Sequence, residues 1–233
     1  MLRAPALPVL ILLTLPLAAG ATGFTPPDGC TLHMTVQTRG CVVANYYTCD
    51  SDAAGDRRTV FADKDGIFSL TRIDAETRWM ESYSPVDGIT DRLVPEAHAH
   101  ASFTRLIETG RDDYDFAIVD STGEVRRYRG HDRLTGETRS IDGRLLEVTE
   151  FAVQVDSGTG EPLYARRGHQ FIDRGQRLFF GGQETLEVTG SAPEVSNEEP
   201  VYFALPGEPG FAASTPEYDC DVLMTAAPPG RAG

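Results

Sequence analysis

The chain has 233 residues, of which 40% are hydrophobic, and a formal net charge of −14 at pH 7. This length suits one large domain or two small ones, and the apolar share is enough to form a buried core. The negative charge argues against nucleic acid and against anionic membrane surfaces as partners, because both bind to basic protein faces. Composition therefore excludes two classes of partner without naming a function.

The first 21 residues have the pattern of a secretory signal peptide. Arg3 gives a positively charged start, an apolar run covers residues 8–18, and residues 19–21 read Ala-Gly-Ala, which is typical of a cleavage site. The run is too short for a membrane-spanning helix, which argues against the alternative of a single anchor. All basic residues except Lys64 are arginine, a bias that GC-rich bacterial genes produce. Cleavage would leave a periplasmic or secreted protein with a charge of −15.

The rest of the chain predicts a single β-rich domain over residues 22–222 and a disordered tail over residues 223–233. β-prone runs alternate with turn signals that are too short for the helices that join parallel strands. Such links favour an antiparallel meander in which successive strands are neighbours. The expected strands cover residues 32–37, 42–47, 58–62, 67–73, 78–83, 114–119, 124–128, 138–141, 144–155, 163–172, 177–180 and 201–205, and residues 191–200 are expected to form a loop.

One short helix is expected to begin after Ser102. The Ser102 hydroxyl suits a helix N-cap, and Phe103, Leu106 and Ile107 share one face of the following turns. Gly110 suits the left-handed position just past the helix C-terminus. The sequence therefore predicts about two helical turns between β-rich regions.

The long run over residues 144–155 indicates the architecture. Phe151 and Val155 lie on one face of an extended strand, whereas Leu146 and Val148 lie on the other. A strand that changes its buried face indicates strong coiling or a bulge. The predicted fold class is all-β, a mainly antiparallel meander with one short helix that forms a curved sheet, a barrel or a half-barrel. A two-sheet sandwich is the alternative.

Four cysteines in an exported chain are expected to form two disulfides. If the first two strands form a hairpin, Cys30 lies beside Cys49, and Cys41 lies at the opposite end of the second strand. The Cα atoms of a disulfide must lie within ~7 Å of each other, so this geometry favours Cys30–Cys49 and Cys41–Cys220. A bend between residues 41 and 49 would instead allow Cys41–Cys49 with Cys30–Cys220.

The strongest indication of a metal site is Glu96-Ala97-His98-Ala99-His100. Alternate side chains of an extended segment point the same way, so Glu96, His98 and His100 could offer one oxygen and two nitrogen ligands to Zn²⁺. No fourth ligand can be assigned, although Asp112 and two further aspartates follow the helix. A solvated loop is the favoured interpretation, and no cofactor is predicted.

Six arginines form a basic zone within this acidic chain: Arg126, Arg127, Arg129, Arg133, Arg166 and Arg167. The zone could bind an anionic ligand. Acidic residues are interleaved with the arginines, however, and favour ion pairs across neighbouring strands instead.

The sequence contains no motif of a nucleotide site, a serine hydrolase or a zinc protease, so the chain is expected not to be an enzyme. The first hypothesis is an exported protein that binds an apolar small molecule or lipid inside a curved sheet. Its alternatives are a disulfide-bonded envelope protein that binds other proteins, and a metal-dependent enzyme that uses His98 and His100. Aromatic residues suited to the first hypothesis are Trp79, Tyr83, Phe116, Phe151, Phe171 and Phe180.

Overall fold

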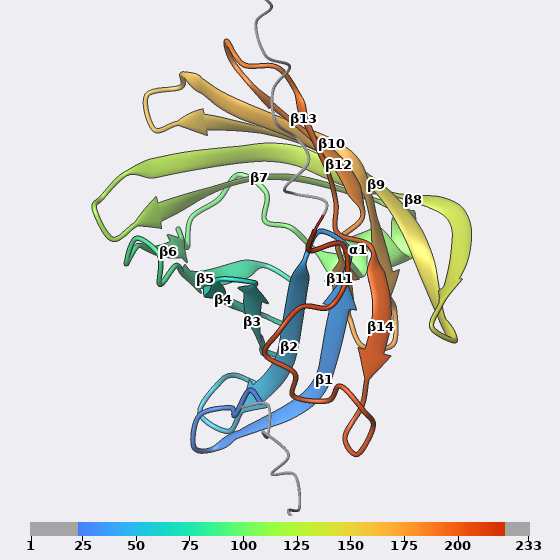
Figure 1. Cartoon of the computed structure of the whole chain (residues 1–233). Coiled ribbons are helices and arrows are strands. Elements are labelled where there is room, and N and C mark those ends of the chain that lie inside the picture. The colour runs from blue at the N-terminus through green and yellow to red at the C-terminus, as the bar shows by residue number, and fades with distance from the viewer. Residues whose placement is uncertain (1–22, 222–233) are drawn as a thin grey trace, which may run out of the picture.

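Fourteen β-strands form one sheet in the computed structural model, which describes residues 23–221 (Figure 1). The expected signal peptide and C-terminal tail lie outside the described residues. The strand order is β13-β12-β10-β9-β8-β7-β6-β5-β4-β3-β2-β1-β14, and β11 pairs with β10 beside this path. The elements are β1 (Cys30–Thr38), β2 (Val42–Cys49), β3 (Arg57–Asp63), β4 (Gly66–Ile73), β5 (Trp79–Tyr83), β6 (Thr90–Leu93), α1 (Phe103–Thr109), β7 (Arg111–Asp120), β8 (Val125–Ile141), β9 (Arg144–Ser157), β10 (Pro162–Asp173), β11 (Leu178–Phe180), β12 (Gln183–Val188), β13 (Glu194–Asn197) and β14 (Pro200–Ala204).

Strands β1 to β10 are neighbours in chain order and pair antiparallel, which confirms the predicted meander. Short turns make this order possible. Between β8 and β9, for example, Asp142 and Gly143 both have positive φ values, 47° and 75°. Two left-handed residues in a two-residue loop match the right-handed twist of the flanking strands, so this turn fixes the register of the longest hairpin.

The sheet is curved but does not close, so the expectation of a half-barrel is correct, and a closed barrel and a two-sheet sandwich are wrong. Strands β13 and β14 form the two edges, yet only Glu198 and Glu199 separate them in the sequence. Here the edges meet, because the Glu198 amide donates to the Gly182 carbonyl and the Arg39 amide donates to the Glu199 carbonyl. The crossing from one edge to the other thus draws the sheet together at one end without a closing ladder.

The expected strand boundaries were wrong where the strands consist mainly of polar residues and so lack an alternating apolar pattern. Strand β8 is 17 residues long and runs through residues 129–137, which were not expected to be extended. Its register with β9 shifts between Leu134 and Thr138, which lets the long hairpin bend. Strands β6, β12 and β13 were not expected, and β13 lies within the predicted loop at residues 191–200. Strand β13 is exposed and largely polar, so only its pairing with β12 defines it.

Helix α1 forms where the sequence predicted it. The Ser102 hydroxyl accepts a hydrogen bond from the Arg105 amide, and Gly110 adopts the left-handed conformation with φ of 80°. Phe103 and Leu106 are buried. Across residues 23–221, no helix is both long enough and apolar enough to span a membrane.

The largest hydrophobic core lies where the two edges approach each other, and we call it the packed end. It joins β1, β2 and β14 to β9, β10 and β11, strands far apart in the sheet order. Curvature of the sheet brings them face to face, so their side chains fill the space between them. Its buried residues are Met34, Val36, Ala44, Tyr46, Leu146, Val148, Phe171, Leu178, Phe180 and Phe203.

Two disulfides join Cys30 to Cys49 and Cys41 to Cys220, the pairs that the hairpin geometry favoured. Cys30 and Cys49 face each other across β1 and β2. Cys41 lies in the loop between these strands, where its amide also donates to the Tyr218 carbonyl. The second disulfide therefore fixes the C-terminal segment to the first hairpin.

Buried polar side chains on the other face of this hairpin hold the same C-terminal segment. Thr35 donates to Asn45 across the strands at 2.7 Å and accepts from the Ala212 amide at 2.8 Å. Gln37 donates from its Nε2 to the Thr215 carbonyl at 3.0 Å. On folding, these side chains lose their hydrogen bonds to water and form hydrogen bonds to the backbone of the C-terminal segment instead. This explains why buried polar residues occur in otherwise apolar strands.

Candidate functional site

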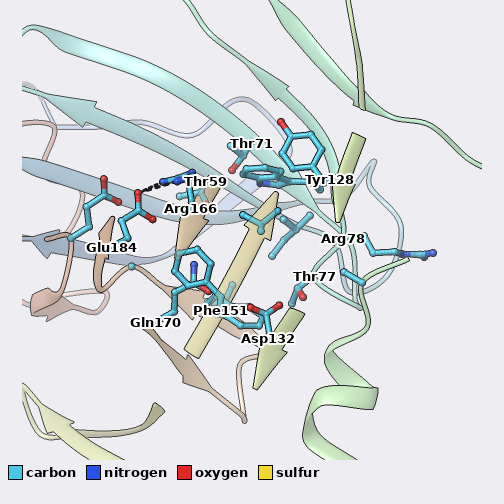
Figure 2. Close-up of a pocket in the computed structure, with 18 of the residues that line it drawn as sticks. Thr59, Thr71, Thr77, Arg78, Tyr128, Asp132, Phe151, Arg166, Gln170 and Glu184 are labelled. Atoms are coloured by element: carbon cyan, nitrogen blue, oxygen red, sulfur yellow. Dashed lines mark hydrogen bonds and ion pairs between the residues drawn. The ribbon is translucent and has the colours of Figure 1, made fainter. Parts of the chain in front are cut away.

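A cavity of about 520 Å³ lies inside the curve of the sheet, beside the packed end (Figure 2). Strands β2 to β5, β7 to β10 and the region around β11 provide most of its walls. Tyr46 and Leu178 belong both to the packed end and to the cavity lining, so the cavity begins where the side chains of the packed end stop. The cavity is therefore a product of incomplete closure of the sheet.

Strand β9 contributes to both regions. Leu146 and Val148 belong to the packed end, whereas Phe151, Val153 and Val155 line the cavity. The two sets lie on opposite faces of an alternating strand, as the sequence predicted. One long strand thus supports a filled core with its first half and a cavity wall with its second half.

Aromatic side chains provide about a third of the cavity lining. Phe116 stacks on Tyr128 at 5.3 Å between ring centroids, Tyr114 lies 5.6 Å from Phe116, and Trp79 meets Tyr128 edge-on at 6.2 Å. These rings come from β5, β7 and β8 and form a continuous wall. The aromatic lining consists of Tyr46, Phe61, Phe68, Trp79, Tyr114, Phe116, Tyr128, Phe151, Tyr164 and Phe179.

The aromatic residues singled out from the sequence divide between the two regions. Trp79, Phe116 and Phe151 line the cavity. Phe171 and Phe180 are instead buried in the packed end. Tyr83 is exposed and lies outside the cavity lining.

Asp132 faces this aromatic cavity without a partner. It lies opposite Phe151 of β9 and opposite Asp112 of β7, and Figure 2 shows its carboxyl group beside the Phe151 ring. No hydrogen bond or ion pair connects Asp132 to another residue of the described chain. Burial, followed by the charge of Asp112, raises the pKa of Asp132 to about 7. This carboxyl group therefore changes its charge near neutral pH.

The opposing Asp112 has a structural role. Its carboxylate accepts a hydrogen bond from the Ser102 amide at 2.7 Å, and Arg105 lies 3.3 Å away. Burial raises the pKa of Asp112, while the Ser102 amide and Arg105 favour its charged form. Asp112 thus anchors the start of helix α1, and of the two opposed aspartates only Asp132 is free for a ligand.

Gly130 makes room for a ring next to Asp132. A Cβ atom at Gly130 would lie 2.3 Å from the Ala152 carbonyl oxygen and 3.0 Å from Cε2 of Tyr114. Gly130 and Asp132 are two positions apart on one face of β8, so the Tyr114 ring over Gly130 is a diagonal neighbour of Asp132. Burial, and secondarily the charge of Asp132, raises the pKa of the Tyr114 phenol.

Polar groups also line the cavity beyond β9, on the same stretch of sheet as Asp132. Arg166 on β10 forms an ion pair with Glu184 on β12, shown by the dashed line in Figure 2. Glu198 lies nearby without an ion-pair partner within residues 23–221. Burial, and then the charge of Glu184, raises the pKa of Glu198, whereas Arg166 lowers it. This wall therefore carries two carboxyl groups and one guanidinium group.

The second arginine of the lining is Arg78. It forms an ion pair with Asp74 at 2.5 Å, and in Figure 2 its side chain extends away from the other labelled residues. Both arginines of the lining are therefore paired with acids. Among the described lining residues, the unpaired carboxyl groups are those of Asp132 and Glu198, so the cavity is acidic.

The residues of the expected metal site are not gathered around one point. The chain bends at Pro95 and His98, which removes the extended geometry that the expectation required. Glu96 and His98 are exposed, whereas His100 lines the cavity and its Nε2 atom lies 2.9 Å from the Pro95 carbonyl oxygen. In the described part of the chain, no three His, Cys, Asp or Glu side chains form a group that could hold a metal. Metal binding by this segment stays a prediction that the geometry does not favour.

The basic zone consists of ion pairs, as the interleaved acids suggested. Each of its arginines contacts a carboxylate on another part of the sheet, which leaves none of them free to form an anion site. The pairs are Arg126–Asp91, Arg127–Asp115, Arg129–Asp156, Arg133–Glu150, Arg166–Glu184 and Arg167–Glu187.

Sequence reasoning missed Asp132 and Tyr114 as cavity residues. Asp132 lies in the part of β8 that was not expected to be a strand, so its alternation with Tyr128 and Gly130 went unused. Only the extension of β8 through residues 129–137 would have placed these three side chains on one face.

Comparison of the chain with protein-family models, curated proteins and solved structures found no match. Interpretation of the cavity therefore rests on its own geometry and chemistry.

Proposed function

We propose that the chain is an exported, non-enzymatic protein that binds an apolar or amphipathic small molecule, such as a lipid, in the cavity. The observation that carries this proposal is a space of about 520 Å³ whose lining is mostly aromatic and aliphatic, with polar side chains among these groups. Small-molecule sites typically have ~300–1,000 Å³ and this kind of lining. Two disulfides support export, because such bonds persist in oxidising compartments.

Trp79 makes the proposal directly testable. It is the only tryptophan of the chain and it lines the cavity, so its fluorescence reports on ligands there. We expect N-phenyl-1-naphthylamine, an uncharged apolar probe, to bind with one site per chain and to quench Trp79 by energy transfer. A saturable signal with micromolar affinity supports the proposal.

Thr71 offers a matched pair of variants. It lies on β4 among the cavity-lining residues and makes no side-chain hydrogen bond to another described residue. Thr71→Phe adds a ring to the cavity and is expected to weaken probe binding at least tenfold, whereas Thr71→Val keeps the shape and should bind normally. Binding that Thr71→Phe leaves unchanged, or the absence of energy transfer from Trp79, would contradict the proposal.

A further inference from the structure

The unpaired charges of the cavity suggest the chemical class of the ligand. An apolar cavity for a neutral lipid needs no free carboxyl group, because burial of an unpaired charge is costly. This cavity nevertheless contains the half-buried Asp132 with no partner in the described chain, whereas the second unpaired acid of the lining, Glu198, is exposed. The carboxyl group of Asp132 therefore needs an explanation that the proposed apolar ligand alone does not supply.

No protein cation is placed to neutralise Asp132. Arg105 is engaged with Asp112, and Arg166 is engaged with Glu184 two strands away, roughly 10 Å in backbone spacing. The titratable or charged groups around Asp132 are Asp112 and Tyr114 from β7, Arg105 from α1, His100 from the preceding loop, and Arg166 with Glu184 from β10 and β12, while β9 presents Phe151.

Two aromatic rings lie next to the free carboxyl group of Asp132. Phe151 is its direct cross-strand neighbour, and Tyr114 is its diagonal neighbour over Gly130. The wall continues from Tyr114 through Phe116 to Tyr128. Ring faces attract cations, and a half-buried carboxylate with adjacent rings suits an organic ammonium group, which can form a charge-assisted hydrogen bond to it.

We propose that the cavity binds an amphipathic cation, with its ammonium group at Asp132 between Phe151 and Tyr114 and its apolar part along Phe116 and Tyr128. This inference rests on the proposed function and specifies its ligand class. An anionic lipid is disfavoured, because its carboxylate or phosphate would meet two unpaired acids and no free arginine in the described lining.

The test compares three ligands that differ only in their head group: decylammonium, decanol and decanoate, each below its micelle-forming concentration. Trp79 fluorescence and calorimetry at pH 8 measure their affinities. We expect decylammonium to bind at least tenfold more tightly than decanol, and decanoate to bind most weakly. If none of the three binds, the proposed function fails; if decanol or decanoate binds as tightly as decylammonium, only the cation inference fails.

Variants that remove a single charge test whether the preference for decylammonium depends on Asp132. Asp132→Asn is expected to weaken decylammonium about tenfold and to leave decanol unchanged. Glu150→Gln is the matched control, because Glu150 is exposed and paired with Arg133 on the sheet. Equal losses in both variants, or no loss in Asp132→Asn, would overturn the assignment to Asp132.

A pH series on the unaltered protein provides a second readout that does not depend on the variant. Decylammonium stays protonated between pH 6 and 8.5, as lysine does. Its affinity should rise over this range as Asp132 ionises, whereas decanol affinity should stay constant. The rise should disappear in Asp132→Asn; its persistence there would assign the pH dependence to another group and would overturn the proposal.

Discussion

The packed end and the cavity are built from the same curved sheet, yet one is filled and the other is open. At the packed end, the two edges of the sheet approach each other through Glu198 and Glu199, and side chains from β1, β2 and β14 reach those of β9 to β11. Around the cavity, β3 to β5 and β7 to β10 do not pack against each other, and rings from both sets line the space between them. The comparison shows that the distance between opposing strands, and not side-chain type, decides which region is core.

The largest change in stability should come from removal of the disulfide that joins the first hairpin, part of the packed end, to the C-terminal segment. Replacing both Cys41 and Cys220 by alanine removes a cross-link over 179 residues, which is expected to lower the free energy of unfolding by about 5 kcal/mol. The same change at Cys30 and Cys49, a span of 19 residues, should lower it by about 3 kcal/mol. Urea unfolding of both variants tests the order, and a larger loss at Cys30 and Cys49 would contradict it.

Removing a ring should distinguish the filled region from the open one. Phe171 is fully buried in the packed end, so Phe171→Ala should lower stability by about 4 kcal/mol. Phe116 is only partly buried and faces the cavity, so Phe116→Ala should lower stability by about half as much. Thermal unfolding measures both. Equal losses would show that the cavity wall is packed as tightly as the core.

Asp132, which lines the cavity, should make the stability of the protein depend on pH. Its pKa is raised to about 7 in the folded chain, so the folded state holds this proton more tightly than the unfolded state does. The resulting stabilisation is complete below pH ~4, the unfolded value, and is lost as pH rises towards 7. Asp132→Asn should therefore stabilise the protein at pH 8.

We expect this gain to be about 2 kcal/mol, roughly half of the full effect of the pKa shift, because the side chain also faces the open cavity. Urea unfolding of both proteins at pH 5 and pH 8 provides the measurement. The free energy difference between the two proteins should shrink at pH 5. A constant difference would separate the effect of the substitution from the ionisation of Asp132.

The smallest loss of stability is expected at the start of helix α1, which Asp112 of β7 holds through the Ser102 amide. Ser102→Ala removes the hydroxyl that accepts from the Arg105 amide at 3.1 Å, and should lower stability by about 1 kcal/mol. Ser102→Gly should lower it by only a few tenths of that amount. Denaturant unfolding distinguishes the two. A loss as large for glycine as for alanine would point to the Ser102 contact with Glu76 instead of the cap.

Local chemistry made the helix and several hairpins predictable. Ser102 and Gly110 fixed the helix ends, and Asp142 with Gly143 fixed the β8–β9 turn. At these positions the conformation that each residue type prefers is also the one found in the fold. The disulfide pairs followed from the first hairpin. The candidate site was far less predictable: Asp132 lies in a polar stretch of β8 where alternation was masked by charged residues that pair across the outer face of the sheet.

The sequence by itself determined the antiparallel meander, the capped helix and the change of face along β9, because these depend on short-range geometry, and it favoured the disulfide pairs without excluding the alternative. Only the tertiary structure decided that the sheet stays open, that Trp79, Phe116 and Phe151 face a cavity while Phe171 and Phe180 fill a core, and that Asp132 stands unpaired among rings. The reason is physical: alternation assigns a side chain to a face of a strand, whereas the curvature of the whole sheet sets how far away the opposite wall lies.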